Sequence, residues 1–181
     1  MTAPPDIVEA GDFDMPFDAD ANLWPIWRRA ARLPTVDAAI RAIYDDLAKA
    51  VEHRGAQCWL SGRCCHFDAF GHRLYVTALE IAWVETYAGM PSTPVVRGEA
   101  CPYQVKHQCS IHATRPLGCR IFFCQEGTEA WQQDLYEAKL DALRDLHERF
   151  DIPYRYLEWL EGLEEYAMQN RAFETDQGDA R

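Results

Sequence analysis

Apolar side chains recur every three or four residues in two long stretches of the chain, and this spacing predicts two amphipathic helices. The first stretch follows Thr35, which can cap a helix, and ends near Gly55, a residue suited to terminating one. The second runs from about residue 128 to residue 150. The apolar positions are Val36, Ile40, Ile43, Leu47 and Val51 in the first stretch and Trp131, Leu135, Ala138, Ala142 and Leu146 in the second.

Shorter elements are predicted between these two helices. Residues 73–76 have the pattern of a short strand. Thr77 followed three positions later by Glu80 fits a capping box, which predicts a helix to about Tyr87. Residues 90–125 contain many turn-forming residues and no sustained period, so we expect loops there, with one short strand at residues 121–123.

The ends of the chain complete the expected organisation. Residues 1–33 form an acidic, proline-containing N-terminal extension, whose Trp24 and Trp27 can pack onto the domain. Asp151 is expected to cap a further helix with Pro153 near its first turn, and residues 171–181 form a frayed tail. The prediction is a mainly α fold: one helical domain, 34–170, whose helices bracket a cysteine-rich, metal-binding loop region, 56–125, with a few short strands.

Charge is distributed unevenly along the chain. The net charge of −11 argues against general binding to nucleic acid, which needs a basic surface. Residues 53–124, however, contain seven basic and four acidic residues, a net of +3, and all seven cysteines lie in this same segment. Positive charge there can offset the negative charge that several thiolates bring to one centre.

The cysteines favour a metal centre over disulfides. The first 20 residues contain no apolar signal segment, and no run of about 18 apolar residues offers a membrane span, so we expect a cytoplasmic protein with no membrane partner. Thiols stay reduced in the cytosol, and an odd number of cysteines does not suit a closed set of disulfides. The candidate metal ligands are Cys58, Cys64, Cys65, Cys101, Cys109, Cys119 and Cys124.

The cysteine spacing indicates a metal without identifying it. Four thiolates typically hold zinc or an iron–sulfur cluster. Only the step from Cys119 to Cys124 has a spacing usual for zinc, and no step matches a ferredoxin. Adjacent side chains usually point apart, so Cys64 and Cys65 do not easily complete one tetrahedral site. Either one is a ligand and the other packs, or the two serve separate or bridged metals.

Other residues accompany the cysteines in a specific string. They are Thr77 and Glu80, Cys101-Pro102, Cys109-Ser110-Ile111-His112, Arg115-Pro116 and Cys119-Arg120-x-Phe122-x-Cys124. In these residues the chain resembles the CxxCxxCC family, the YkgJ-type cysteine-cluster proteins, described as zinc- or iron-chelating domains. The resemblance covers residues 58–124, a little over a third of the chain, and implies a cysteine-held metal centre.

One position departs from the family pattern. The opening C-x2-C-x2-C-C run of the family would place a cysteine at position 61, where this chain has Ser61. If the full set served two centres, His66, His107 or His112 would have to supply a ligand, so a single centre is the simpler expectation. A similar cysteine cluster occurs in flagellin lysine methylases, and this resemblance implies an iron–sulfur centre. This chain contains no glycine-rich cofactor loop, so the resemblance does not extend to methylase activity.

Two arginines stand beside candidate ligands. Arg115 and Arg120 are candidates for cofactor binding, by donating to thiolate sulfurs or to an anion near the centre. The alternative is a salt bridge to the acidic outer helices. Aromatic residues at helical spacing, such as Trp159, are expected in the core or at a partner surface.

Three functional hypotheses follow. The first is an iron–sulfur centre, most simply a [4Fe–4S] cluster, in a redox or modification role. The second is a structural zinc domain that presents its helices to an unknown protein partner. The third is an iron enzyme with histidine ligands and an open coordination position. The sequence names no substrate and leaves open whether the protein is an enzyme.

Overall fold

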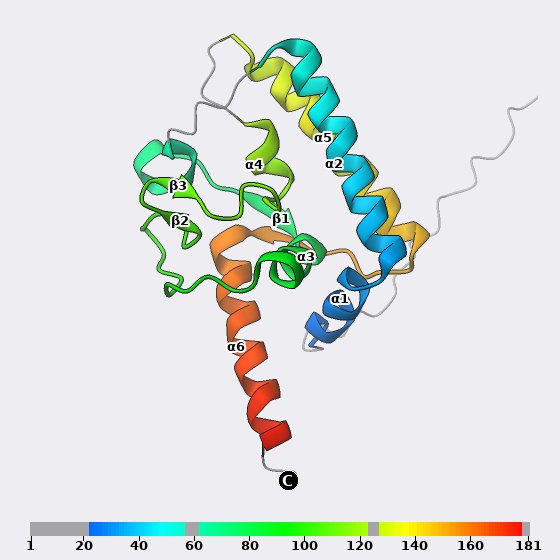
Figure 1. Cartoon of the computed structure of the whole chain (residues 1–181), viewed down its shortest axis with the longest axis vertical. Helices are drawn as coiled ribbons and strands as arrows, with labels where there is room; N and C mark the ends of the chain where they lie inside the picture. The colour runs from blue at the N-terminus through cyan, green and yellow to red at the C-terminus, as the bar shows by residue number, and fades with distance from the viewer. Residues whose placement is uncertain (1–21, 57–61, 123–126, 179–181) are drawn as a thin grey trace, which may run out of the picture.

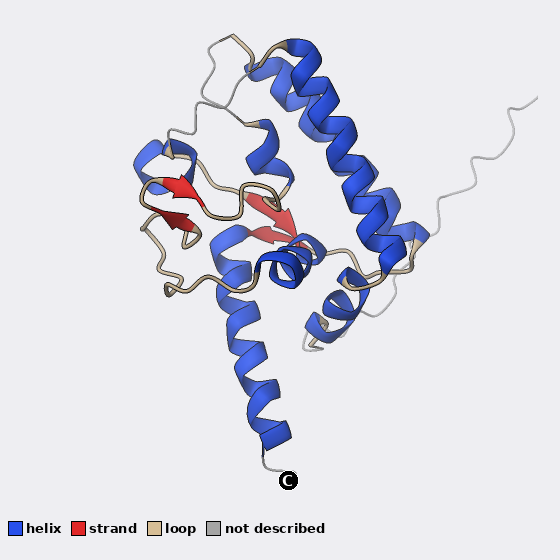
Figure 2. Cartoon of the chain, in the orientation of Figure 1, coloured by secondary structure: helices blue, strands red, loops and turns tan. Residues whose placement is uncertain are grey.

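The computed structural model describes residues 22–56, 62–122 and 127–178, with the backbone alone at residues 70 and 171–178. Helices dominate these residues, so the predicted mainly α fold is confirmed (Figure 1; Figure 2). The α-helices are α1 (Trp24–Ala31), α2 (Pro34–Arg54), α3 (Ala78–Ala88), α4 (Leu117–Ile121), α5 (Glu129–Arg149) and α6 (Trp159–Gly178). In this part of the chain, no helix has the length and apolar character needed to cross a membrane.

Two small antiparallel sheets and two short 3-10 helices join the α-helices. Strand β1 (Tyr75–Thr77) pairs with β4 (Tyr156–Glu158), so that Val76 lies opposite Leu157. Strands β2 (Gln104–Val105) and β3 (Gln108–Cys109) form a hairpin. The 3-10 helices are η1 (Arg63–Cys65) and η2 (Asp68–Phe70).

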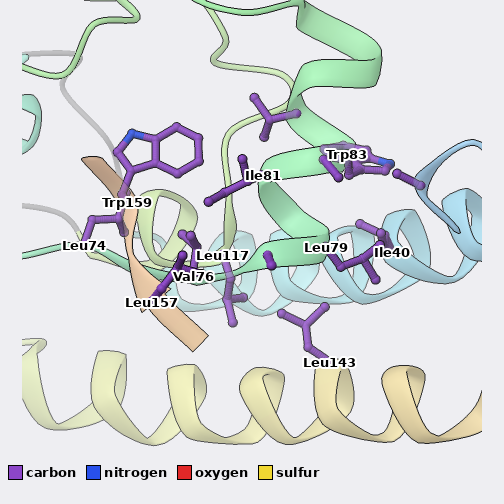
Figure 3. Close-up of a cluster of buried hydrophobic side chains, with 14 of the residues drawn as sticks. Ile40, Leu74, Val76, Leu79, Ile81, Trp83, Leu117, Leu143, Leu157 and Trp159 are labelled. Atoms are coloured by element: carbon purple, nitrogen blue, oxygen red, sulfur yellow. The ribbon is translucent and has the colours of Figure 1, made fainter. Parts of the chain in front are cut away.

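Helix α3 occupies the centre of the fold. Residues 78–84, its first seven, are all buried, as expected for a helix that is apolar around its whole circumference. Helix α1 packs against α3, with Trp24 and Trp27 buried, and α2 packs along α5 (Figure 1). Figure 3 shows the shared core, to which α2, β1, α3, α4, α5, β4 and α6 contribute Ile40, Val76, Leu79, Leu117, Leu143, Leu157 and Trp159.

The two helices predicted from the apolar spacing are present as α2 and α5. The predicted cap at Thr35 is wrong, because α2 begins at Pro34 and Leu33 is its N-cap, without a side-chain hydrogen bond. Helix α2 ends at Gly55, whose left-handed φ of 71° allows its N–H to donate to Glu52 O at 2.9 Å. Helix α3 begins with the predicted capping box: the Thr77 hydroxyl accepts from Glu80 N, and the Glu80 carboxylate accepts from Thr77 N. Helix α5 covers nearly the whole of the second predicted stretch.

The predicted start of the last helix, at Asp151, is wrong. Asp151 has a φ of 51°, strand β4 follows, and α6 begins only at Trp159. The reason is tertiary pairing. Ala78 N donates to Arg155 O at 2.9 Å, and Trp159 N donates to Leu74 O at 2.8 Å, so the segment satisfies the buried backbone of β1 instead of capping itself.

The strand predicted at residues 121–123 is also wrong for its described part. Ile121 ends helix α4 and Phe122 follows without strand pairing, while Phe123 lies outside the described residues. One helical turn brings Leu117 and Ile121 to the same face, and both are fully buried. Burial of both side chains explains why this turn is helical.

A single buried carboxylate connects three of these elements. Glu80 is 2% exposed. Its Oε1 accepts from the Tyr44 hydroxyl of α2 and from Leu117 N at the start of α4, both at 2.8 Å. Its Oε2 accepts from Thr77 N at 2.8 Å and from the Thr77 hydroxyl at 3.2 Å. The carboxylate is the acceptor in each of these bonds, which suits its ionised form. Within the part of the chain that the structure describes, no cation forms an ion pair with it.

We predict that Glu80→Gln destabilises the protein by about 2–3 kcal/mol, because an amide NH₂ would face donors in place of one carboxylate oxygen. Chemical denaturation followed by circular dichroism measures the change. Glu137→Gln is the matched control, since Glu137 is exposed on α5 and accepts from Gln133 Nε2 alone among the described residues. Equal stabilities of the two variants would contradict the role given to Glu80.

Candidate metal centre

Five of the seven candidate ligands lie among the described residues, and all five are free thiols. Cys64 and Cys65 lie in η1, Cys101 precedes β2, Cys109 ends β3 and Cys119 lies in α4. Cys58 and Cys124 lie outside the described residues, as does Ser61. The described thiols therefore come from four separate segments of the chain.

Backbone contacts tie the first two of these segments together. Cys101 N donates to Cys65 O at 2.6 Å, and Gln104 Nε2 donates to Gly62 O at 2.8 Å. Gly62 has a left-handed φ of 71°, and a Cβ there would lie 2.5 Å from His107 O in the turn of the hairpin. The η1 turn and the β2–β3 hairpin can approach this closely because position 62 carries no side chain.

Helix α4 holds Cys119 in place through its neighbours. The Glu80 carboxylate binds the N–H of Leu117, and a Cβ at Gly118 would lie 2.6 Å from the Leu74 side chain. The Arg120 guanidinium donates to Arg115 O at 2.6 Å and to Ala113 O at 2.7 Å. The loop before α4 is thus bound to α4 itself, which limits the positions available to Cys119.

The thiols are close enough to influence one another's ionisation. Burial, followed by the charges of Cys101, Cys64 and Cys109, raises the pKa of Cys119 well above its usual value. Burial raises the pKa of Cys101 to about 11, against the lowering effect of a hydrogen bond from Trp159. All five described thiols are thus electrostatically connected, since the charges of Cys101 and Cys109 also raise the pKa of Cys65. Cys64, Cys101, Cys109 and Cys119 are called the four-thiol group below.

The adjacent cysteines differ from each other. The hydrogen bond between them lowers the pKa of Cys64 and raises that of Cys65, and the positive charge of Arg115 lowers the pKa of Cys64 further. Cys65 is buried, whereas Cys64 is partly exposed. The two side chains therefore differ in exposure, but their mutual hydrogen bond shows that they turn toward each other, so the expectation that they point apart is wrong here.

The two candidate arginines have different roles in this structure. The Arg120 guanidinium lies 4.1 Å from the centroid of the Tyr44 ring and bonds carbonyl oxygens. Arg115 acts on the thiols through its charge, and its buried Nε has no hydrogen-bond partner among the described residues. Within the same residues neither arginine forms an ion pair with the outer helices.

The histidines are spread around the centre. His72 Nε2 lies 3.1 Å from Cys64 O. His107 is exposed in the hairpin turn with a φ of 65°, and His112 is exposed on the following loop. Partial burial, followed by the charges of Arg115 and Arg120, lowers the pKa of His112.

Sequence reasoning missed the contact of Trp159 with the centre. Its indole N–H donates to Cys101 Sγ at 3.4 Å, and its ring lies 5.9 Å from that of Tyr103. Trp159 is also fully buried, as its apolar pattern predicts. Its 58-residue separation from Cys101 leaves no local signal of the contact.

No ready-made metal site is present in the part of the chain that the structure describes: no three Cys, His, Asp or Glu side chains there are arranged to share one ion. The described thiols nevertheless offer the soft donor type that zinc and iron–sulfur clusters require. Shared ligation by the four-thiol group would need its sulfurs to move closer together.

We predict that Gly62→Ala destabilises the protein by about 1–3 kcal/mol more than Gly71→Ala. Both glycines have left-handed φ values, 71° and 65°, so both substitutions carry the same backbone strain. Only the methyl group added at position 62 meets backbone, because nothing lies within 4 Å of the one added at position 71. Denaturant unfolding of both variants measures the difference, and equal values would remove the close approach as a constraint.

Searches against protein families, curated protein sequences and solved structures find no match for this chain. The resemblance to the CxxCxxCC family consequently rests on the motif residues alone. The chemistry of the site has to be argued from its own side chains.

Proposed function

We propose that this protein binds a metal centre through cysteine thiolates, and that the centre is an iron–sulfur cluster of the [4Fe–4S] type. The observation that carries the proposal is the four-thiol group. Four separate segments bring their cysteines into one electrostatically connected group: η1, the residues before β2, the end of β3, and α4. The resemblance to the CxxCxxCC family points to the same chemistry.

The proposed ligands are Cys64, Cys101, Cys109 and Cys119. Each of these lies in the mutually interacting group, and they provide the four thiolates that such clusters take. Cys65 is the proposed non-ligand of the adjacent pair, because the hydrogen bond between the two thiols raises the pKa of Cys65 and lowers that of Cys64. Binding would draw the loops inward, and Cys58 and Cys124 remain candidate ligands outside the described residues.

Metal binding by the four-thiol group would have to displace thiol protons. Burial raises the pKa values of Cys101 and Cys119, so both thiols stay protonated at neutral pH unless a metal replaces their protons. The thiolates would bring more negative charge than the metal neutralises. The positive charge of Arg115 and the hydrogen bond from the Trp159 N–H to Cys101 would offset the remainder. A bound cluster would supply one-electron redox chemistry, and hydrogen bonds to sulfur are a recognised means of setting its potential.

A structural zinc centre is the second candidate. The observation in its favour is the sparse regular structure between α3 and α4. The regular elements of this segment are β2 and β3, and each contains two residues. A zinc ion held by four cysteines would stabilise such a segment in place of an extensive apolar core.

One measurement distinguishes these two candidates. We expect the protein purified without oxygen to be brown, with broad absorption near about 400 nm and several irons per chain, because Zn²⁺ is d¹⁰ and colourless. Visible spectroscopy and elemental analysis on the same sample provide the result. A colourless protein with stoichiometric zinc would replace the first candidate with the second, and absence of both metals would reject both.

Substitution of single cysteines tests the ligand assignment. We predict that Cys119→Ala loses the metal and destabilises the domain by several kcal/mol, roughly the share of metal-binding free energy that one ligand carries. Cys65→Ala is the matched comparison, and we expect it to keep the metal at wild-type stoichiometry. Metal content and thermal unfolding are measured for both. Full metal content in Cys119→Ala would show that Cys119 is not a ligand.

A further inference from the structure

A cavity of about 460 Å³ lies next to the proposed centre. Two thiols of the four-thiol group, those of Cys64 and Cys119, form part of its lining. Its volume lies within the range of roughly 300–1,000 Å³ that is usual for small-molecule sites. A small molecule in this cavity would therefore sit against two of the proposed ligands.

Aromatic rings form much of the cavity wall. Tyr75 stacks on Tyr156 with 5.6 Å between centroids, and Phe122 lies 5.2 Å from Tyr136. Tyr75, Phe122 and Tyr156 are 44%, 41% and 38% exposed, which is high for large side chains that converge on one place. Exposed rings around a hollow favour a flat apolar ligand, which would remove their faces from water.

The charge of the lining favours an anion. Arg63 and Arg73 both line the cavity and are exposed, and none of its lining residues among those that the structure describes is acidic. This local charge contrasts with a whole-chain net charge of −11. The hydroxyl groups of Tyr136 and Tyr156 share a hydrogen bond in which one donates and the other accepts. The second hydroxyl proton can therefore be donated to an oxygen of a ligand.

We propose that this cavity binds a planar aromatic molecule that carries an anionic group such as a carboxylate or a sulfonate. The rings hold the planar part, Arg73 and Arg63 attract the anion, and the bound molecule lies against Cys64 and Cys119. The inference rests on the proposed function in one respect, that the bound molecule would react at the metal centre. Binding itself depends on the cavity residues alone.

The test compares two probes with the same rings. One is 8-anilino-1-naphthalenesulfonate, which combines a flat naphthalene ring system with an anionic group, and the other is N-phenyl-1-naphthylamine, which lacks the sulfonate. Binding to the full chain, purified without oxygen, is measured by equilibrium dialysis, since a coloured centre would absorb probe fluorescence. We expect one saturable site per chain that binds the sulfonate more tightly than the neutral probe.

Two variants locate that site. Phe122→Ala should weaken both probes about tenfold, as expected from loss of a ring contact, whereas Arg73→Gln should weaken only the sulfonate, by about threefold. The matched controls are Met168→Ala, at a residue that is 53% exposed, and Arg97→Gln, at a side chain that is 65% exposed; neither residue lines the cavity. Both controls should bind both probes like wild type.

The outcomes separate the two proposals. Absence of saturable binding, or equal effects of cavity and control variants, would overturn the cavity proposal, as would equal affinity for both probes. Metal content is recorded for every sample. A protein that binds the sulfonate as expected but holds no metal would retain the cavity and reject the metal centre, and the reverse result would do the opposite.

Discussion

The bonds of the buried Glu80 carboxylate are the constraint on which much of the structure depends. An ionised group with 2% exposure is expensive unless every lone pair that matters is used, and here four donors converge on its two oxygens. These donors belong to α2, to the start of α3 and to the start of α4. One side chain therefore fixes the relative position of three elements, and a capping box, normally a local device, acts here as a tertiary joint.

The consequence for the candidate metal centre follows from α4. This helix has only five residues and could not hold its conformation alone, because helix nucleation is unfavourable. Glu80 binds its first N–H, burial of Leu117 and Ile121 anchors one face, and Arg120 fastens the preceding loop. The position of Cys119 is thus set by interactions of the turn that carries it. It depends on the Glu80 carboxylate, which forms no hydrogen bond with a thiol among the described residues.

The sequence was informative where a local pattern and the tertiary structure agree. The period of α2 and α5, the stop at Gly55 and the Thr77–Glu80 box all act within a few residues, so the sequence alone predicted them correctly. It failed at Asp151, where pairing with β1 outweighed a capping signal, and it could not show that Trp159 reaches Cys101. The wider role of Glu80 was equally hidden, because Tyr44 and Leu117 lie 36 and 37 residues away.

Consecutive residues of α4 face different parts of the molecule, and this links the core, the thiols and the cavity. Successive side chains on a helix point about 100° apart. Leu117 therefore enters the core, Gly118 makes room for Leu74 and borders the cavity, and Cys119 belongs both to the four-thiol group and to the cavity wall. Any ligand that pressed on this wall would press on the turn that carries Cys119. Because Glu80 and the buried faces resist movement of that turn, the thiol and the cavity wall are held in register with each other, as a site that brings a small molecule to a metal centre requires.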